Sequence, residues 1–115
     1  MENCPFCKII SGEVESKIVY QDDLVTAFKD YDPKAPVHLL IIPNRHITSV
    51  NEVEPGDEII LGRLFITARQ LAEQNQIHQT GYRLVVNTGK DAFQSVMHIH
   101  MHLIGGRHLS NIFRD

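Results

Sequence analysis

The sequence has no excess of positive charge and no long hydrophobic run. Its 115 residues carry 11 Lys and Arg against 14 Asp and Glu, which gives a net charge of −3. It therefore lacks the basic surface that a protein coating DNA or RNA needs. The longest aliphatic run, residues 39–42, is far shorter than the ~18 residues that span a bilayer. We therefore expect neither a nucleic-acid partner nor a membrane partner.

Glycine-rich phosphate loops and export signals are also missing. Neither G-x-x-x-x-G-K-[ST] nor G-x-G-x-x-G occurs, so the known loops of P-loop and Rossmann proteins cannot supply phosphate binding. The amino terminus has no basic start followed by an apolar run, which predicts a protein of the reducing cytoplasm. No repeat or low-complexity tract divides the chain, so we expect one domain over residues 1–115.

The hydrophobic pattern predicts an α+β fold. Strands are expected at residues 18–21, 24–29, 37–42, 82–86 and 96–104. A short helix is expected near residues 4–12, and a long one from about 54 to about 75, where apolar residues recur at steps of three and four. These elements predict a mostly antiparallel sheet of about five strands, with one long helix across a face and one short N-terminal helix.

Three histidines near the carboxyl end alternate with aliphatic residues. On a strand, this period places His98, His100 and His102 on one face. Each imidazole needs a polar partner when it is buried, so three in register are hard to explain as core residues. Such a face can chelate a catalytic metal, supply a general acid or base, or supply a nucleophilic ring nitrogen. Spacing alone leaves all three chemistries open.

Cys4 and Cys7 form a C-x-x-C pair. In a reducing compartment this pair is typical of half a metal site or of a redox pair. The alternative is two unpaired buried cysteines that pack as small hydrophobic residues.

The segment His98–Ile104 resembles the signature of the HIT (histidine triad) superfamily of nucleotide hydrolases and transferases, in which histidines alternate with hydrophobic residues. The other matching segments are Phe28–Asp30, Ala35–His38, Pro43–Ile47, Val85–Asn87 and Gln94–Val96. Gly105–Arg107 is similar to the Hint branch, the histidine triad nucleotide-binding proteins, rather than to the Fhit-like hydrolases. The proline that uridylyltransferases carry inside this motif is absent.

This resemblance implies an HIT-like fold, a homodimer and a hydrolase of purine nucleoside phosphoramidates or related nucleotides. His100 would attack the α-phosphorus and form a covalent nucleotidyl-histidine. His102 would contact the phosphate, and the His98 carbonyl would receive the proton on the other nitrogen of His100. Ser95 would serve the leaving group, and His38 would complete the catalytic group.

The resemblance also implies binding residues. For the nucleotide these are Pro5, Phe6, Ile9, Phe28 and Tyr31 at the base, Asp30 at the ribose, and Asn87, Gln94 and Val96 around the phosphate. From their spacing alone, the aromatic residues fit a core equally well, and Ser95 and Asn87 fit turns. In zinc-carrying members, the ligands match Cys4, Cys7, His46 and His98. This set implies one structural Zn²⁺ per chain, because an all-protein Cys₂His₂ set leaves no position open.

Three alternatives remain from the sequence: a dinucleoside polyphosphate hydrolase, a nucleotide-binding regulator with incidental turnover, and a hydrolase whose triad binds a catalytic metal. The apolar segment Gly81–Val86 supports the homodimer, because an open apolar edge strand invites aggregation unless a partner covers it.

Overall fold

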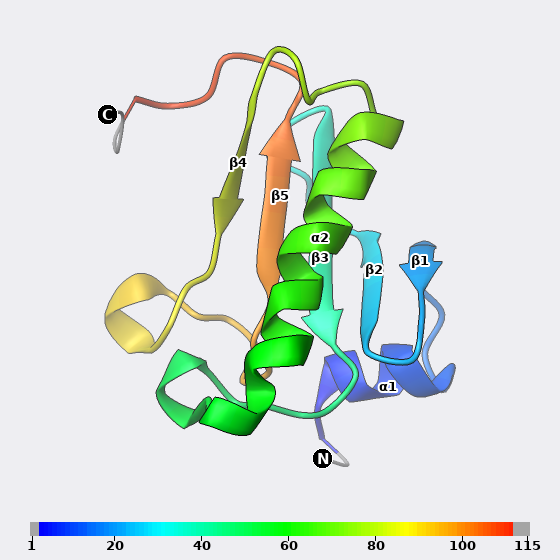
Figure 1. The fold of residues 1–115 in the computed structure, drawn as a ribbon, viewed down its shortest axis with the longest axis vertical. Helices are drawn as coiled ribbons and strands as arrows, with labels where there is room; N and C mark the ends of the chain where they lie inside the picture. The colour runs from blue at the N-terminus through cyan, green and yellow to red at the C-terminus, as the bar shows by residue number, and fades with distance from the viewer. Residues whose placement is uncertain (1–2, 112–115) are drawn as a thin grey trace.

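The computed structural model describes residues 3–111, which form a five-stranded antiparallel sheet and two α-helices (Figure 1). The elements are α1 (Pro5–Ser11), β1 (Ile18–Gln21), β2 (Val25–Lys29), β3 (Val37–Pro43), α2 (Glu58–Gln74), β4 (Tyr82–Val85) and β5 (Met101–Gly105). Three short 3-10 helices, η1 (Val50–Glu52), η2 (Pro55–Asp57) and η3 (Lys90–Ala92), lie in the connections. The strand order is β1-β2-β3-β5-β4, so the predicted α+β fold is confirmed.

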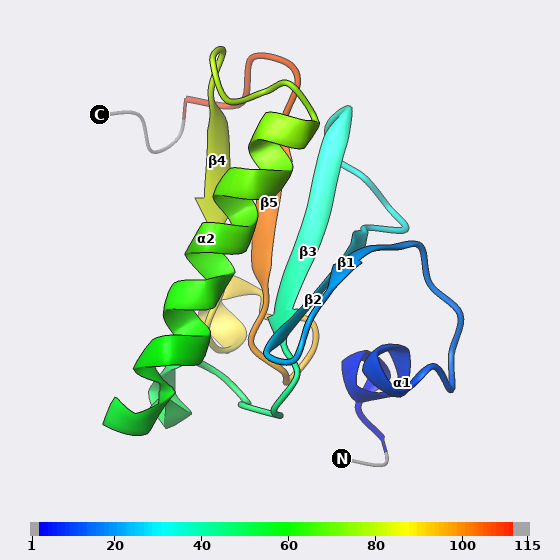
Figure 2. The ribbon, with the colours of Figure 1, turned by 45° about the vertical axis from the view of Figure 1, so that its right-hand side comes forward.

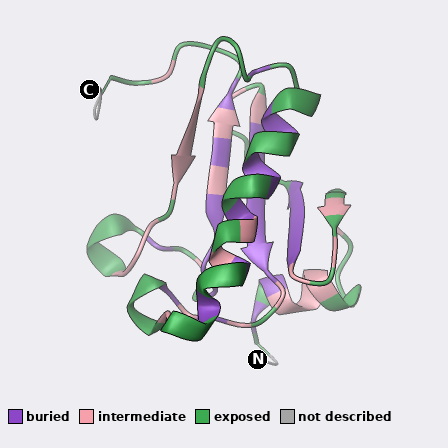
Figure 3. Cartoon of the chain, in the orientation of Figure 1, coloured by how far each residue is buried: buried purple, intermediate pink, exposed green. Residues whose placement is uncertain are grey.

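The two helices lie on opposite sides of the sheet (Figure 2). The apolar stripe of α2 is buried against one face, as predicted; its residues are Ile60, Leu64, Ala68, Leu71 and Ala72. Alternate residues of β3 divide between the two faces, because Leu39 and Ile41 pack in the α2 core, whereas Leu40 and Ile42 pack with Phe6 of α1. Strands β2 and β3 are consequently buried over nearly their whole length, whereas buried and half-buried residues alternate along β5 (Figure 3). Among the described residues, no helix has the length and apolarity needed to cross a membrane.

Helix α1 is short but has clear end signals. The Cys4 side chain caps its amino end by accepting the Cys7 N–H at 3.3 Å, and Pro5 occupies the first turn, where its missing N–H costs nothing. Gly12 ends the helix with φ +82°, a conformation that favours glycine. A seven-residue helix is not stable alone, so its position depends on contacts with the sheet.

The predicted strand over residues 96–104 is shorter in the structure and begins at Met101. Strand β5 lies between β3 and β4, and its ladder with β3 ends at the pair Ile41 and Met101. Two residues further along β3 stands Pro43, whose ring leaves no N–H to donate. Before Met101 the chain instead follows the segment after β3, and the Ile99 N–H donates to the Ile47 carbonyl at 2.7 Å. His98 and His100 therefore lie outside the regular strand, and both are buried.

One carboxylate joins the β1–β2 hairpin to α2. Asp22 accepts the N–H groups of Leu24 and Val25, the hydroxyl of Tyr20 and one guanidinium N–H of Arg63 at 2.6–2.8 Å. Burial alone raises the pKa of Asp22, but these hydrogen bonds together lower it to about 2.

Asp22→Asn is expected to lower the free energy of unfolding by about 2 kcal/mol at pH 7, because the charge-assisted hydrogen bonds are lost. The folded pKa lies below the unfolded value, so the difference between wild type and variant is full above pH 4 and shrinks as the pH falls toward 2. Urea unfolding at pH 7 and pH 3 measures this change. Asp23→Asn is the matched control, since the Asp23 side chain is 86% exposed. Equal stability of the two variants would contradict the assignment.

Candidate functional site

Three histidine side chains form a connected group at the start of β5 and on β3. The rings of His100 and His102 have centroids 5.1 Å apart, as do those of His102 and His38. His38 is paired in register with Ile104 across β3 and β5, which brings its ring next to His102. His38 and His100 are buried, whereas His102 is partly exposed. The group therefore has one accessible side.

Hydrogen bonds fix the tautomer of each ring. The Lys34 backbone N–H donates to His38 Nδ1 at 3.0 Å, so the proton of a neutral His38 is on Nε2. That proton points to His102 Nδ1 at 2.9 Å, which places the His102 proton on Nε2. His100 Nδ1 lies 2.9 Å from the His98 carbonyl and donates to it, leaving a lone pair on His100 Nε2. The contact with this carbonyl, which the resemblance implied, is present.

The surroundings of the three rings favour their neutral forms. Burial lowers the pKa of His38 and of His100. Burial, together with the neighbouring His100 and His38, lowers the pKa of His102 to about 4. The group thus presents one free ring nitrogen, on His100, beside one N–H donor, on His102. This arrangement suits attack on an anionic phosphorus centre followed by stabilisation of its oxygens.

The Asp30 carboxylate lies next to His38. Its Oδ2 lies 3.3 Å from His38 Nε2, and its Oδ1 accepts the Asp32 N–H at 2.8 Å. Asp30, His38 and His102 are close enough to ligate a cation. However, His38 Nδ1 is occupied by the Lys34 N–H, so His38 Nε2 carries a proton and has no lone pair to offer a metal. The geometry favours a hydrogen-bonded chain at this place.

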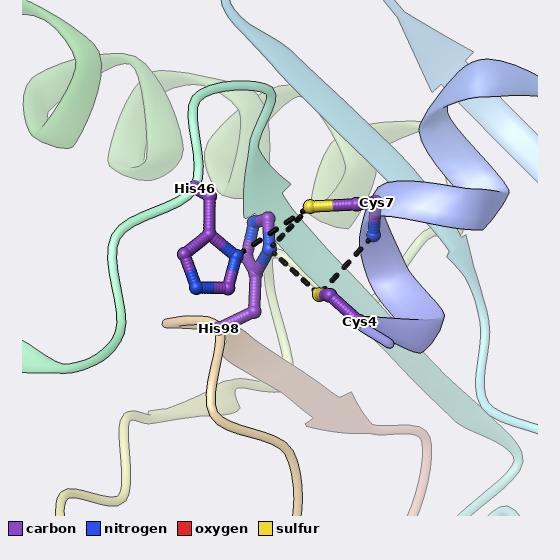
Figure 4. A group of neighbouring side chains, drawn as sticks. All are labelled: Cys4, Cys7, His46 and His98. Carbon is purple, nitrogen blue, oxygen red and sulfur yellow. Dashed lines mark hydrogen bonds between the residues drawn. The ribbon is translucent and has the colours of Figure 1, made fainter. Parts of the chain in front are cut away.

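A second cluster brings together Cys4, Cys7, His46 and His98 (Figure 4). Cys4 is the N-cap residue of α1 and Cys7 lies in this helix, His46 comes from the loop after β3, and His98 from the segment before β5. His98 Nδ1 lies 3.3 Å from Cys4 Sγ and 3.6 Å from Cys7 Sγ, and His46 Nδ1 lies 3.5 Å from Cys7 Sγ. Bonds of ~2.0–2.3 Å to a tetrahedral Zn²⁺ give ligand separations of about 3.3–3.8 Å. The cluster therefore fits a tetrahedral cation.

The chemistry of the donors agrees with that fit. His98 Nε2 donates to the Pro43 carbonyl at 2.8 Å, so its Nδ1 lone pair faces the sulfurs. Burial and the adjacent Cys4 raise the pKa of the Cys7 thiol to about 11. A thiolate at this place needs a cation beside it.

The HIT domain model matches residues 11–109, which is most of the chain and includes all three triad histidines. The chain belongs to the HIT family.

Relatives within the HIT family cover nearly the whole chain. The chain is 55% identical over 108 residues to the purine nucleoside phosphoramidase of Escherichia coli strain K12, covering 94% of this chain and 91% of the relative. A HIT family hydrolase from Clostridium thermocellum superposes with a TM-score of 0.93 at 46% identity over 96% of each chain. One from Legionella pneumophila Philadelphia 1 gives 0.92 at 44% identity, covering 94% of this chain and 96% of that chain.

The residues that the HIT resemblance places around the phosphate lie in the loop before the triad. Ser95 is exposed and lines a pocket of about 650 Å³ together with Val96. Asn87 is partly exposed after β4. The Gln94 amide is engaged within the protein: it accepts the Gly89 N–H and donates to the Thr48 and Val96 carbonyls. Gln94 thus shapes the loop, and the backbone N–H groups remain the predicted phosphate donors.

The residues predicted for the base gather around α1. The rings of Phe6 and Phe28 are in edge-to-face contact at 5.4 Å, and the Phe6 ring also lies 5.1 Å from that of His100. Ile9 packs on this cluster, and Pro5 lines the pocket beside Ser95. Tyr31 is fully exposed. The structure thus brings the Phe6 ring to His100 and the Phe28 ring to Phe6, and it leaves the Tyr31 side chain exposed to solvent.

Sequence reasoning missed the groups that set the tautomers. The Lys34 N–H and the Pro43 carbonyl are backbone atoms, which any residue type can supply, so no side chain signals them. Arg107, which holds the Lys34 carbonyl at 2.6 Å, was noted only as part of the Gly105–Arg107 match.

Proposed function

We propose that this protein hydrolyses purine nucleoside 5′-phosphoramidates at the α-phosphorus. The observation that carries the proposal is the free Nε2 lone pair of His100, since its Nδ1–H is held by the His98 carbonyl. The 55% sequence identity of the chain to a purine nucleoside phosphoramidase supports the substrate class.

The proposed reaction has two displacements. His100 Nε2 attacks the α-phosphorus and the phosphorus–nitrogen bond to the leaving amine breaks. The departing amine takes a proton from the Ser95 hydroxyl, which regains one from solvent. Water then attacks the same phosphorus, breaks its bond to His100 and gives up one proton to solvent. This second step releases the nucleoside monophosphate and returns His100 to its neutral form.

His102 and His38 assist both displacements. His102 Nε2–H is oriented as a donor because its Nδ1 accepts from His38, and a donor to a phosphoryl oxygen is most effective as charge develops. We assign the base to the surface around Pro5, Phe6, Ile9, Phe28 and Tyr31, and the ribose hydroxyls to Asp30. The phosphate is assigned to Asn87 and to the backbone at Val96, in a loop whose shape Gln94 maintains through its hydrogen bonds to Gly89 and Val96.

We also propose that Cys4, Cys7, His46 and His98 hold one structural Zn²⁺. The separations of 3.3–3.6 Å between sulfur and nitrogen support it. A bound ion would tie α1 to the loop after β3 and to the triad segment, without taking part in the displacement. Thiolate ligands persist in a reducing compartment, which agrees with the expectation of a cytoplasmic protein.

A homodimer is the proposed assembly. Ile59, Phe65 and Ile66 of α2 are 54–76% exposed, and Gly62 lies between them with open space above it. An exposed glycine inside a helix costs stability, but it permits close approach of a second helix. Strand β4 is one of the two edges of the sheet, and an edge strand is suited to pairing with a copy of itself. Light scattering at micromolar concentration should give twice the chain mass, and a monomer mass would contradict the proposal.

The direct test is rapid quenching with adenosine 5′-phosphoramidate followed by intact-protein mass spectrometry. A nucleotidyl adduct on the wild type, absent from His100→Ala, is expected. Turnover without an adduct, abolished by brief chelation, would point to a metal-dependent hydrolase. Binding of AMP without turnover would point to a regulator, and faster cleavage of dinucleoside polyphosphates would move the activity to that class.

A further inference from the structure

The segment that follows β5 reaches back to the loop that sets the histidine tautomers. Arg107 donates from Nη2 to the Lys34 carbonyl at 2.6 Å and from Nη1 to the His108 carbonyl at 2.7 Å. Its guanidinium therefore bridges the Asp32–Pro36 loop and the chain after β5. The same Lys34 gives its backbone N–H to His38 Nδ1 at 3.0 Å.

Gly106 makes this approach possible. It has φ +95°, and a Cβ atom on it would lie 3.0 Å from Pro36 Cβ, closer than ordinary van der Waals contact. The loop thus rests directly on the Gly106 backbone at one point and is held by Arg107 at another.

We propose that Arg107 is a positioning residue that sets the hydrogen-bond polarity of His102 through Lys34 and His38. With Lys34 held, its N–H fixes the lone pair on His38 Nδ1 and the proton on Nε2. That proton in turn fixes the lone pair on His102 Nδ1 and leaves Nε2–H as the outward donor.

Loss of the Arg107 contact frees the loop. The longer contact with Asp30 Oδ2, at 3.3 Å, is then the remaining contact besides His102 that favours the proton on His38 Nε2. In a fraction of molecules His38 carries its proton on Nδ1 instead, which turns the Nε2 lone pair toward His102. Two lone pairs cannot share that 2.9 Å contact, so His102 takes its proton on Nδ1 and loses its outward donor. This inference rests on the proposed function for its kinetic consequence, while the tautomers themselves are independent of any substrate.

The other contacts of the loop do not replace Arg107. Lys34 Nζ binds the carboxylate and carbonyl of Asp32, and Asp32 N–H binds Asp30. These bonds lie within the loop or at its start, so they shape it without anchoring it to β5. Among the hydrogen bonds described, Arg107 supplies the side-chain link from the loop to the segment after β5.

The test combines kinetics with ¹⁵N imidazole NMR of the ligand-free protein. Arg107→Met should lower kcat for adenosine 5′-phosphoramidate about tenfold and change KM by no more than about twofold. The loss of kcat is smaller than the ~10²–10³-fold loss on removing an oriented donor outright, because the His102 ring is still present. In its spectrum, His102 Nδ1 should gain protonated character, whereas in the wild type it is unprotonated. Arg107→Lys should restore part of kcat, because an ammonium can hold the Lys34 carbonyl.

Arg83→Met is the matched control, since Arg83 also donates to a backbone carbonyl at 2.7 Å, but this carbonyl belongs to Ser110 and not to the Asp32–Pro36 loop. It should keep both kcat and the His102 tautomer. Gly106→Ala is a second variant that displaces the loop without removing the arginine, and it should shift the tautomer in the same direction. A wild-type His102 tautomer in folded Arg107→Met would overturn the inference, whether or not kcat falls. If the wild type shows no phosphoramidase activity, the proposed function fails, and the NMR comparison still decides this inference.

Discussion

Replacement of His100 by alanine is expected to lower kcat for adenosine 5′-phosphoramidate by more than about 10³-fold. The variant loses the Nε2 lone pair, and with it the covalent route. His102 cannot take over through Nδ1, because that nitrogen already accepts from His38. AMP should still bind within about threefold of wild type, since the aromatic residues and the phosphate loop remain. Single-turnover kinetics and calorimetric AMP titration measure the two quantities.

Two further variants are expected to have smaller effects on turnover than His100→Ala. His102→Ala removes one oriented donor and should cost about 10²–10³-fold, with the adduct still forming slowly. Ser95→Ala should be severe with a poor amine leaving group and mild with a good one, because protonation matters only when departure is difficult. Near wild-type turnover by a folded, AMP-binding His100→Ala protein would refute the covalent mechanism. The triad would then be a metal site or a binding surface.

Cys4→Ser is expected to remove the bound metal and to lower the free energy of unfolding by about 4 kcal/mol, the value for a site in the presence of free metal at about 1,000 times its Kd. Serine is a good helix cap, so its hydroxyl can replace the sulfur that accepts the Cys7 N–H. The substitution thus separates loss of a ligand from loss of the cap. Elemental analysis and thermal unfolding should change together, while kcat of the folded fraction stays near wild type.

Ser11→Ala is the control for a general effect on α1. Ser11 lies at the end of this helix, where its hydroxyl donates to the Lys8 carbonyl, and it is exposed. It should keep one metal ion per chain. Wild-type protein purified without chelator and free of metal would rule out the zinc proposal, as would Cys4→Ser protein that retains metal at wild-type stability.

Much of the fold could be predicted because the buried face of a helix or strand requires hydrophobic residues at a regular spacing in the sequence. The steps of three and four in α2 and the end signals Pro5 and Gly12 of α1 are local properties. The length of β5 could not be predicted in the same way. Alternation continues through His98 and His100, but a strand also needs a partner, and the pairing of β5 with β3 stops at Ile41, close to the end of β3 at Pro43. The start of β5 therefore depends on a strand more than fifty residues away in the sequence.

The candidate site could also be predicted only in part from the sequence. The reactive and metal-ligating side chains, such as His100 and Cys4, stand out in the sequence as motifs. In the structure the triad histidines gather in one cluster, and the cysteines gather with His46 and His98 in another. The atoms that decide their protonation are carbonyls and N–H groups, such as those of His98 and Lys34. Every residue carries these atoms, so their use depends on tertiary placement alone.

His98 contributes to two neighbouring sites through different atoms: its imidazole faces the cysteines, and its carbonyl holds His100. These two contributions are unequal under mutation. Only a few residue types can replace a ligating imidazole, whereas any residue at this position retains a carbonyl. A change at Cys4, Cys7, His46 or the His98 side chain would therefore remove a ligand of the proposed Zn²⁺ and still leave the carbonyl that holds His100 Nδ1. The proposed contribution of the metal to stability can thus be lost without altering the backbone contact that orients the proposed nucleophile.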